Sequence, residues 1–240
     1  MLDFIERRQF LKLSAGTLAA SLLSRREVPM SFPEKLDHIL LGSPELQGGI
    51  DFVDKHTGVR AMFGGVHPGR GTQNALLSLG ERRYLEIIAP DPAQPGVKNP
   101  LASNLYSLKG PRLVGWADHP GNITAFAEKL RAAGIQFEGP TPGSRKRPDG
   151  RLLQWQTLNL ADTESGLLPF FIEWGQDSIH PSIDAPNGCA LLSFAAETPE
   201  PDKFAARLTT LGLDLHVKQG QHTRLRAVIS GPKGNLEMSS

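Results

Sequence analysis

The sequence is poor in cysteine and has almost no excess of charge. Cys189 is the single cysteine among 240 residues, so no disulfide can form within the chain and no zinc site can be built from several thiolates. Any metal ligands are therefore nitrogen and oxygen atoms. Lys and Arg number 26 against 25 Asp and Glu, and the longest basic run is the tripeptide Arg145-Lys146-Arg147. We expect no nucleic-acid partner, because such a partner requires a concentrated basic surface.

The sequence also lacks the short motifs of several common enzyme classes. It has no phosphate-binding P-loop, no glycine-rich dinucleotide turn followed by a helix, and no Gly-x-Ser-x-Gly elbow. What it has is an ordinary globular composition, with 39% hydrophobic and 21% charged residues. This length and composition predict one large hydrophobic core or two modest ones.

A mildly apolar segment near the N-terminus follows the arginine pair Arg7-Arg8. It is short and Lys12 interrupts it, so we expect no stable membrane insertion. The segment resembles a twin-arginine export signal, which implies a periplasmic mature domain. Alternatively, residues 1–29 are an extension upstream of a true start at Met30, and the protein is cytoplasmic. The pattern leaves both interpretations open.

Three segments of the chain share one pattern, in which a strand is followed by an amphipathic helix and then by two or three strands. They span residues 31–92, 111–177 and, as a shorter copy, 188–240. Asn122 is a predicted helix N-cap in the second segment. The helices are predicted to end at glycines spaced by 76 and 78 residues, namely Gly58, Gly134 and Gly212. This near-constant spacing predicts a duplicated βαβββ unit and an α+β fold, in which paired units form a curved, cup-like mixed sheet with the helices outside.

Each segment carries a glutamate in its last apolar strand: Glu86 in YLEIIA, Glu173 in FIEWG and Glu237 in NLEMS. Such a carboxylate either faces solvent by alternation or is buried beside a partner. Alternation places Tyr84 and Ile88 on the same face as Glu86 but does not decide which face is buried. The aromatic neighbours of Glu173 favour an inward orientation, whereas Glu237, close to the C-terminus, is interpreted as frayed.

The sequence resembles the vicinal oxygen chelate superfamily, and within it the glyoxalase-like domain proteins. Four motifs carry the resemblance: LDHILLG (36–42), HPGRGTQNALLSLG (67–80), YLEIIAPDP (84–92) and GLLPFFIEW (166–174). The superfamily includes glyoxalase I, extradiol dioxygenases and the fosfomycin- and bleomycin-resistance proteins. The resemblance covers roughly residues 36–177, and the third segment fits only as a shorter copy.

The resemblance implies a divalent metal ion held by a first-strand His or Gln and a last-strand Glu from paired units. Carried over by position, the ligands are His38, Glu86 and Glu173. One nitrogen and two carboxylates favour Zn, Ni, Co, Mn or Fe(II) over Mg or Ca. The second unit has Val114 where the first has His38, so a site that has lost its metal is the alternative.

The turn GGVHPGRGTQN supplies further candidates. Its glycines and proline are explained by turn chemistry, but His67, Thr72 and Asn74 together could contact a substrate carbonyl or carboxylate. We expect both His67 and Glu173 to act in proton transfer, and Arg70 to orient an anionic group. Trp116 is a predicted wall of the substrate pocket. We interpret the hairpin 143–151 as solvated, and the remaining histidines, including His180, as surface residues.

These observations predict a metal-dependent enzyme of the lyase or isomerase type. It would act on a small molecule with adjacent oxygens, through an enediolate-like anion. Three alternatives remain. The first is a metal-free protein that sequesters a small molecule, as the bleomycin-resistance proteins do, and the second is an oxygenase of the extradiol type. The third is a vestigial cup whose surface contacts another protein. The sequence does not show which units pair or whether pairing crosses a homodimer.

Overall fold

The computed structural model describes residues 32–97, 99–147 and 149–240. The predicted export signal or N-terminal extension lies outside these residues. Within them, no helix combines the length and the apolar character needed to cross a membrane.

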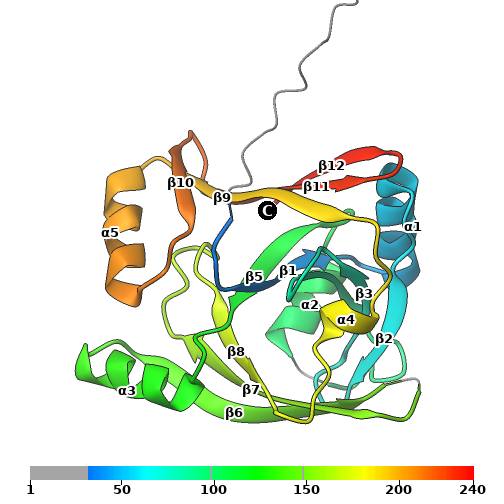
Figure 1. Cartoon of the computed structure of the whole chain (residues 1–240), viewed down its shortest axis with the longest axis horizontal. Helices are drawn as coiled ribbons and strands as arrows, with labels where there is room; N and C mark the ends of the chain where they lie inside the picture. Colours follow the sequence, from blue (N-terminus) through cyan, green and yellow to red (C-terminus); the bar gives the residue numbers. More distant parts are fainter. Residues whose placement is uncertain (1–31, 98, 148) are drawn as a thin grey trace, which may run out of the picture.

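Eight strands form one strongly curved sheet, which we call the curled sheet, in the order β2-β3-β4-β1-β5-β8-β7-β6 (Figure 1). The first unit contributes β1 (Leu36–Gly42), β2 (Met62–His67), β3 (Thr72–Ser78) and β4 (Tyr84–Pro90). The second unit contributes β5 (Arg112–Asp118), β6 (Phe137–Lys146), β7 (Leu152–Leu160) and β8 (Phe170–Trp174). Units one and two therefore pair within this chain.

The two units join through their first strands. In each unit the first strand pairs with the last in parallel, β1 with β4 and β5 with β8, while β1 and β5 pair antiparallel across the junction. The edge strands β2 and β6 also contact each other, so the sheet curls far round on itself. This is the mixed, cup-like α+β architecture that the repeats predicted, and the fold class is confirmed.

The third segment forms a separate four-stranded sheet, in the order β10-β9-β11-β12. Its strands are β9 (Ala190–Thr198), β10 (His216–Gln219), β11 (Arg224–Gly231) and β12 (Gly234–Ser239). In Figure 1 this sheet lies along the top of the molecule, above β1 and β5. Trp116 on β5 meets Phe194 on β9 at a ring-centroid distance of 5.4 Å, so the two sheets share one core.

The described part of the chain has five helices around the sheets: α1 (Leu46–Thr57), α2 (Pro100–Tyr106), α3 (Ile123–Ala132), α4 (Pro181–Asp184) and α5 (Pro201–Leu211). The side chain of Asn122 accepts a hydrogen bond from the backbone N–H of Ala125, as expected of an N-cap. Gly58 and Gly212 are the left-handed C-caps of α1 and α5. The C-cap of α3 is Ala133, and the predicted Gly134 takes the left-handed conformation one residue later. The local signals therefore predicted the ends of these three helices to within one residue.

Strand alternation separates the two faces of the curled sheet. On β1, Ile39 and Leu41 join the core shared with the C-terminal sheet, whereas His38 and Leu40 point to the inner face. Because side chains alternate along a strand, the same division holds on β4 and β8. The inner face is therefore the surface on which a ligand can be enclosed.

Candidate active site

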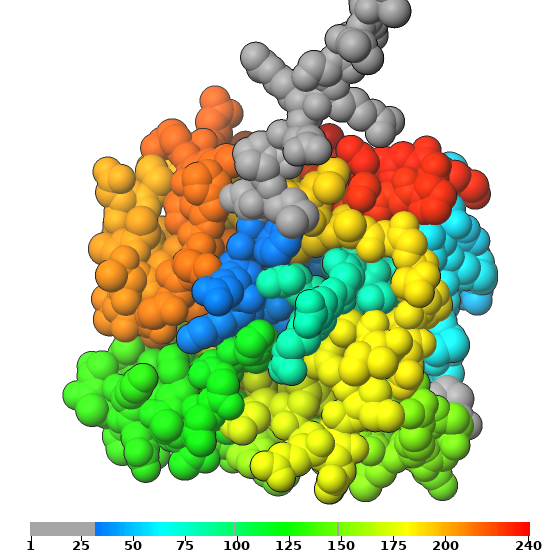
Figure 2. All heavy atoms as spheres, viewed as in Figure 1, coloured from blue at the N-terminus to red at the C-terminus, as the bar shows by residue number. Residues whose placement is uncertain are grey.

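A cavity of about 190 Å³ lies on the inner face of the curled sheet. Side chains from both units line it, and Figure 2 shows that the segment after β8, in yellow, forms much of the front surface of the molecule. The polar lining includes His38, His67, Arg70, Thr72, Asn74, Glu86, Arg145, Thr157 and Asn159. The cavity thus holds most of the residues that the sequence nominated, and it holds others that were missed.

A β-bulge in the first strand aims two neighbouring side chains at the same site. The pairing of β1 with β5 skips a residue between Leu36 and His38, so Asp37 is the extra residue. In a regular strand, Asp37 and His38 would face opposite sides of the sheet. Here Asp37 Oδ1 lies 2.7 Å from His38 Nδ1, and both side chains are almost fully buried.

Asp37 receives three N–H groups. Besides His38, Trp174 Nε1 donates to Asp37 Oδ2 at 3.1 Å, and His180 Nε2 lies 3.1 Å from the same oxygen. The backbone N–H of Ser182 donates to His180 Nδ1, which places the His180 proton on Nε2, pointing at Asp37. Asp37 is therefore held as a carboxylate, and the bond to His38 comes from a protonated Nδ1.

These contacts shift the pKa values of Asp37 and His38. Burial alone would raise the pKa of Asp37, but the hydrogen bonds from His180 and His38 outweigh burial and hold that pKa well below its usual range. For His38, burial would lower the pKa, but Asp37 and Glu86 raise it to about 9. His38 is therefore an imidazolium at neutral pH.

The second nitrogen of His38 faces a carboxylate across the cavity floor. Glu86 Oε2 lies 3.3 Å from His38 Nε2, yet Nε2 makes no hydrogen bond of good geometry and is buried. Burial would raise the pKa of Glu86, but the neighbouring His38 lowers it to about 2. His38 and Glu86 therefore form an ion pair. Because the Nε2–H of His38 has no well-aligned acceptor in the protein, it remains available to a ligand oxygen.

Residues at the end of β2 and on β3 complete the polar side of the cavity. Asn74 Nδ2 donates to Glu86 Oε1 at 2.7 Å and lies 3.4 Å from His67 Nε2. His67 Nδ1 lies 2.9 Å from Thr72 Oγ1, and burial lowers the pKa of His67. His67 is therefore a neutral imidazole, with a lone pair on Nε2 directed toward Asn74 and Glu86. Arg70 lies at the exposed rim.

The second unit contributes an apolar wall. Trp155, Phe170, Ile172 and Trp174 line the cavity, and the ring of Phe170 meets the ring of His38 edge-on at 5.5 Å. On the other side Tyr84 stacks on His38 at 4.5 Å. Two aromatic rings therefore fix the orientation of His38 as firmly as its hydrogen bond to Asp37.

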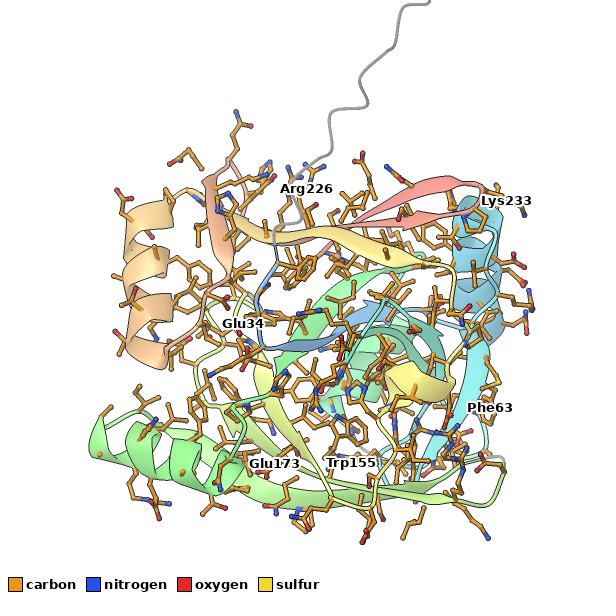
Figure 3. All side chains as sticks on the ribbon, viewed as in Figure 1. Glu34, Phe63, Trp155, Glu173, Arg226 and Lys233 are labelled. Carbon is orange, nitrogen blue, oxygen red and sulfur yellow. The ribbon has the colours of Figure 1, made fainter. Side chains whose placement is uncertain are left out.

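Two predicted site residues lie outside the cavity. Glu173 is on the outer face of β8, where Oε2 accepts the backbone N–H of Ile123 at 2.7 Å and caps α3; Figure 3 shows it beside that helix. The inward residues of β8 are Phe170, Ile172 and Trp174, so the match of Glu173 to Glu86 was wrong by one residue, which reverses the face. Trp116 is fully buried in the shared core, and its indole N–H donates to the carbonyl of Leu167.

The three-ligand metal centre inferred from the resemblance is consequently not assembled. Among the described residues, no three His, Cys, Asp or Glu side chains are grouped so that they could hold a metal ion. His38 and Glu86 converge, but Ile172 occupies the inward position that the second unit was expected to fill with a carboxylate. Of the three predicted ligands, one imidazole and one carboxylate remain at the cavity, which is fewer than the three protein ligands typical of a catalytic ion.

Sequence reasoning missed Asp37, His180 and Arg145. Asp37 precedes a candidate ligand, but only the bulge turns it inward. His180 was assigned to the surface, yet it is 6% exposed and belongs to the Asp37 cluster. Arg145 was assigned to a solvated hairpin, yet it is 3% exposed and lines the cavity.

The curled sheet of paired βαβββ units around one polar cavity defines the vicinal oxygen chelate class of fold. A family model described as "Glyoxalase-like domain" matches residues 36–219. The chain therefore belongs to the glyoxalase-like domain family.

Solved structures of similar fold come from several bacteria. A hypothetical protein from Staphylococcus aureus is 15% identical with a TM-score of 0.57, over 85% of this chain and 84% of that one. Methylmalonyl-CoA epimerase from Mycobacterium tuberculosis is 18% identical with a TM-score of 0.42, over 60% of this chain and 89% of that one. At these identities the likeness concerns the fold alone. A comparison with curated proteins gave no significant sequence match.

Proposed function

We propose that this protein is an enzyme of the lyase or isomerase type, which moves a proton at a carbon next to a carbonyl group of a small substrate. The observation that carries the proposal is the array Asp37–His38–Glu86, in which a buried imidazolium and a carboxylate meet at the floor of a cavity. Buried, mutually perturbed acids and bases in a cleft are typical of proton-transfer sites. Family membership supports an enzyme of this superfamily in general.

The chemical step follows from the charges of the array. We assign Glu86, the ionised carboxylate facing the cavity, as the group that accepts the proton as the substrate C–H bond breaks. His38 lowers the pKa of Glu86 in the free protein, so Glu86 becomes a stronger base once His38 Nε2 turns to the substrate oxygen. The electron pair moves to the adjacent carbonyl oxygen and forms an enolate, which is an enediolate where the deprotonated carbon carries a hydroxyl group. His38 Nε2, which makes no good hydrogen bond in the free protein, donates to that oxygen. The proton then returns to the same or the neighbouring carbon.

His67 assists Glu86. It is a neutral imidazole whose Nε2 lies 3.8 Å from Glu86 Oε1 and 3.4 Å from Asn74 Nδ2. From this position it can relay a proton between Glu86 and the substrate, which is the role that the turn motif suggested. Asn74 donates a hydrogen bond to Oε1 of Glu86, while Oε2 of Glu86 faces His38.

A metal-free binding protein is the second candidate. The observation that favours it is the apolar wall of Trp155, Phe170 and Trp174, which suits sequestration of a planar molecule, together with the incomplete metal donor set. Such a protein would bind a ligand and leave its C–H bonds untouched. Binding without proton exchange therefore distinguishes this candidate from the enzyme.

Solvent deuterium exchange tests the proposal without knowledge of the natural substrate. Purified protein is incubated in D2O with dihydroxyacetone or hydroxypyruvate, and deuterium incorporation next to the carbonyl is followed by proton NMR. We expect exchange above the buffer rate for at least one compound, and loss of that exchange in His38→Gln and Glu86→Gln. Glu173→Gln is the matched control, because this carboxylate lies on the outer face of β8.

Two further measurements define the class of reaction. Metal analysis of the same preparation and assay after chelation show whether exchange depends on a bound ion, and an oxygen electrode detects an oxygenase. Absence of exchange with both compounds, or full exchange in Glu86→Gln, would contradict the proposed proton transfer.

A further inference from the structure

Arg145 is a buried cation that forms no ion pair with a carboxylate of the described residues. It extends from β6 and is 3% exposed, and within the described part of the chain its one hydrogen bond goes to the backbone carbonyl of Gly64 on β2. None of the ion pairs among the described residues includes it. A guanidinium carries five N–H donors, so a single carbonyl leaves most of them without a protein partner. Burying a charge without its counter-ion is costly, and such a charge is normally paired.

The neighbouring arginines of the same hairpin behave differently. Arg147 lies 2.7 Å from Asp184 and 3.4 Å from Asp149, and Arg151 contacts the same two carboxylates. These pairs hold the hairpin against α4 at the surface. Arg145 alone turns inward, where it lines the cavity. Its isolation is therefore a feature of the cavity and not of the hairpin as a whole.

The groups around the cavity carry more positive than negative charge, which favours the binding of an anion. Three cations are present, namely imidazolium His38, buried Arg145 and Arg70 at the rim. They face two carboxylates, Asp37 and Glu86, both ionised. The remaining titratable lining groups, His67 and Tyr84, are neutral, because burial lowers the pKa of the former and raises that of the latter. One bound monoanion would balance the cavity.

We propose that the substrate carries a carboxylate and that Arg145 binds it inside the cavity, which makes Arg145 the residue that selects small 2-oxo or 2-hydroxy acids over their neutral counterparts. This inference rests on the proposed function, since it names the substrate class of the same cavity. The planar fork of the guanidinium suits the two oxygens of a carboxylate. Thr157 and Asn159 line the cavity from β7, beside the strand that carries Arg145, and offer further polar contacts.

Ligand binding tests the proposal without turnover. Isothermal titration calorimetry compares lactate with lactamide, which differ in the carboxylate alone, and uses methylphosphonate as a second kind of anion. We expect the wild type to bind lactate roughly 10- to 100-fold more tightly than lactamide, and Arg145→Gln to lose that preference. Arg145→Lys should keep part of it. Arg147→Gln is the matched control, because it removes a cation from the same hairpin but outside the cavity.

The outcomes separate this inference from the proposed function. Equal binding of lactate and lactamide, a preference that survives in Arg145→Gln, or no binding of lactate would each overturn the carboxylate assignment. Tighter binding of methylphosphonate than of lactate would overturn it in favour of a phosphoryl group. If Arg145→Gln does not fold by circular dichroism, the wild-type comparison and Arg145→Lys decide. Carboxylate preference without deuterium exchange would support this inference and contradict only the enzyme.

Discussion

The two halves of the curled sheet have the same fold but supply different chemistry. Strand β4 of the first unit turns Tyr84, Glu86 and Ile88 toward the cavity, whereas strand β8 of the second unit turns Phe170, Ile172 and Trp174 there. The first unit provides the groups to which we assign proton transfer, and the second provides an apolar wall. A duplicated unit thus keeps its strand pairing while the inward positions diverge.

The difference also explains why the three predicted ligands, His38, Glu86 and Glu173, are not brought together. The first unit keeps an imidazole and a carboxylate 3.3 Å apart, and the second unit has Ile172 in the inward position of its last strand. The charge that the second unit does supply, Arg145, comes from its edge strand β6. The two units therefore cooperate by dividing the tasks of one site.

The largest expected effect is on proton transfer. Glu86→Gln should reduce the rate of deuterium exchange roughly 100- to 10,000-fold, which is the usual contribution of a general base. Glu173→Gln, the same change on the outer face of β8 in the second unit, should leave the rate close to that of the wild type. Comparable losses in both variants would show that the division between the units is wrong.

The next effect concerns the stability of the Asp37 cluster. Asp37→Asn replaces the carboxylate that three N–H donors share, so the free energy of unfolding should fall by about 2 to 4 kcal/mol. Urea denaturation measures this loss. A variant as stable as the wild type would mean that the cluster is not held by the Asp37 charge.

A third prediction uses the pH dependence of stability. Because the folded pKa of His38 is raised to about 9 from an ordinary value of 6.5, the folded state binds the extra proton between these values. Its stabilising contribution, on the order of 3 kcal/mol, is present below about pH 6.5 and is lost as the pH rises through about 9. Denaturation across this range should show the decline in the wild type and a weaker decline in His38→Gln.

The smallest effect belongs to the outer face of the second unit. Glu173→Ala removes the acceptor for the Ile123 N–H at the start of α3, so the protein should lose about 1 kcal/mol of stability. Exchange activity should remain. A large loss of exchange without unfolding would return Glu173 to the active site and contradict its assignment as a helix cap.

The sequence was sufficient for features that depend on local periodicity. The glycine spacing and the helix caps predicted the repeated units, and the family motifs nominated His38, Glu86 and His67, which share the cavity. The exact face of β8 was not predictable, because aromatic residues flank Glu173 on both sides and a shift of one position reverses its direction.

The missed residues depend on long-range structure. A bulge turns Asp37 inward, and that bulge arises where β1 pairs with β5, a strand far away in the sequence. Arg145 reads as one of several charges in a basic hairpin, and only the curling of the sheet brings it beside Gly64. His180 lies in a loop whose position is fixed by Asp37, far away in the sequence. Local patterns carry no signal for such contacts.

Nitrogen-15 NMR of the imidazole of His38 reports directly whether the first unit holds the array Asp37–His38–Glu86 in a charged state. We predict that both His38 nitrogens are protonated at neutral pH, that the group titrates with a pKa of about 9, and that Glu86→Gln lowers this pKa. A neutral His38 at pH 7, titrating at or below its ordinary pKa in the wild type, would show that the array is not charged and would rule out the proposed role of His38.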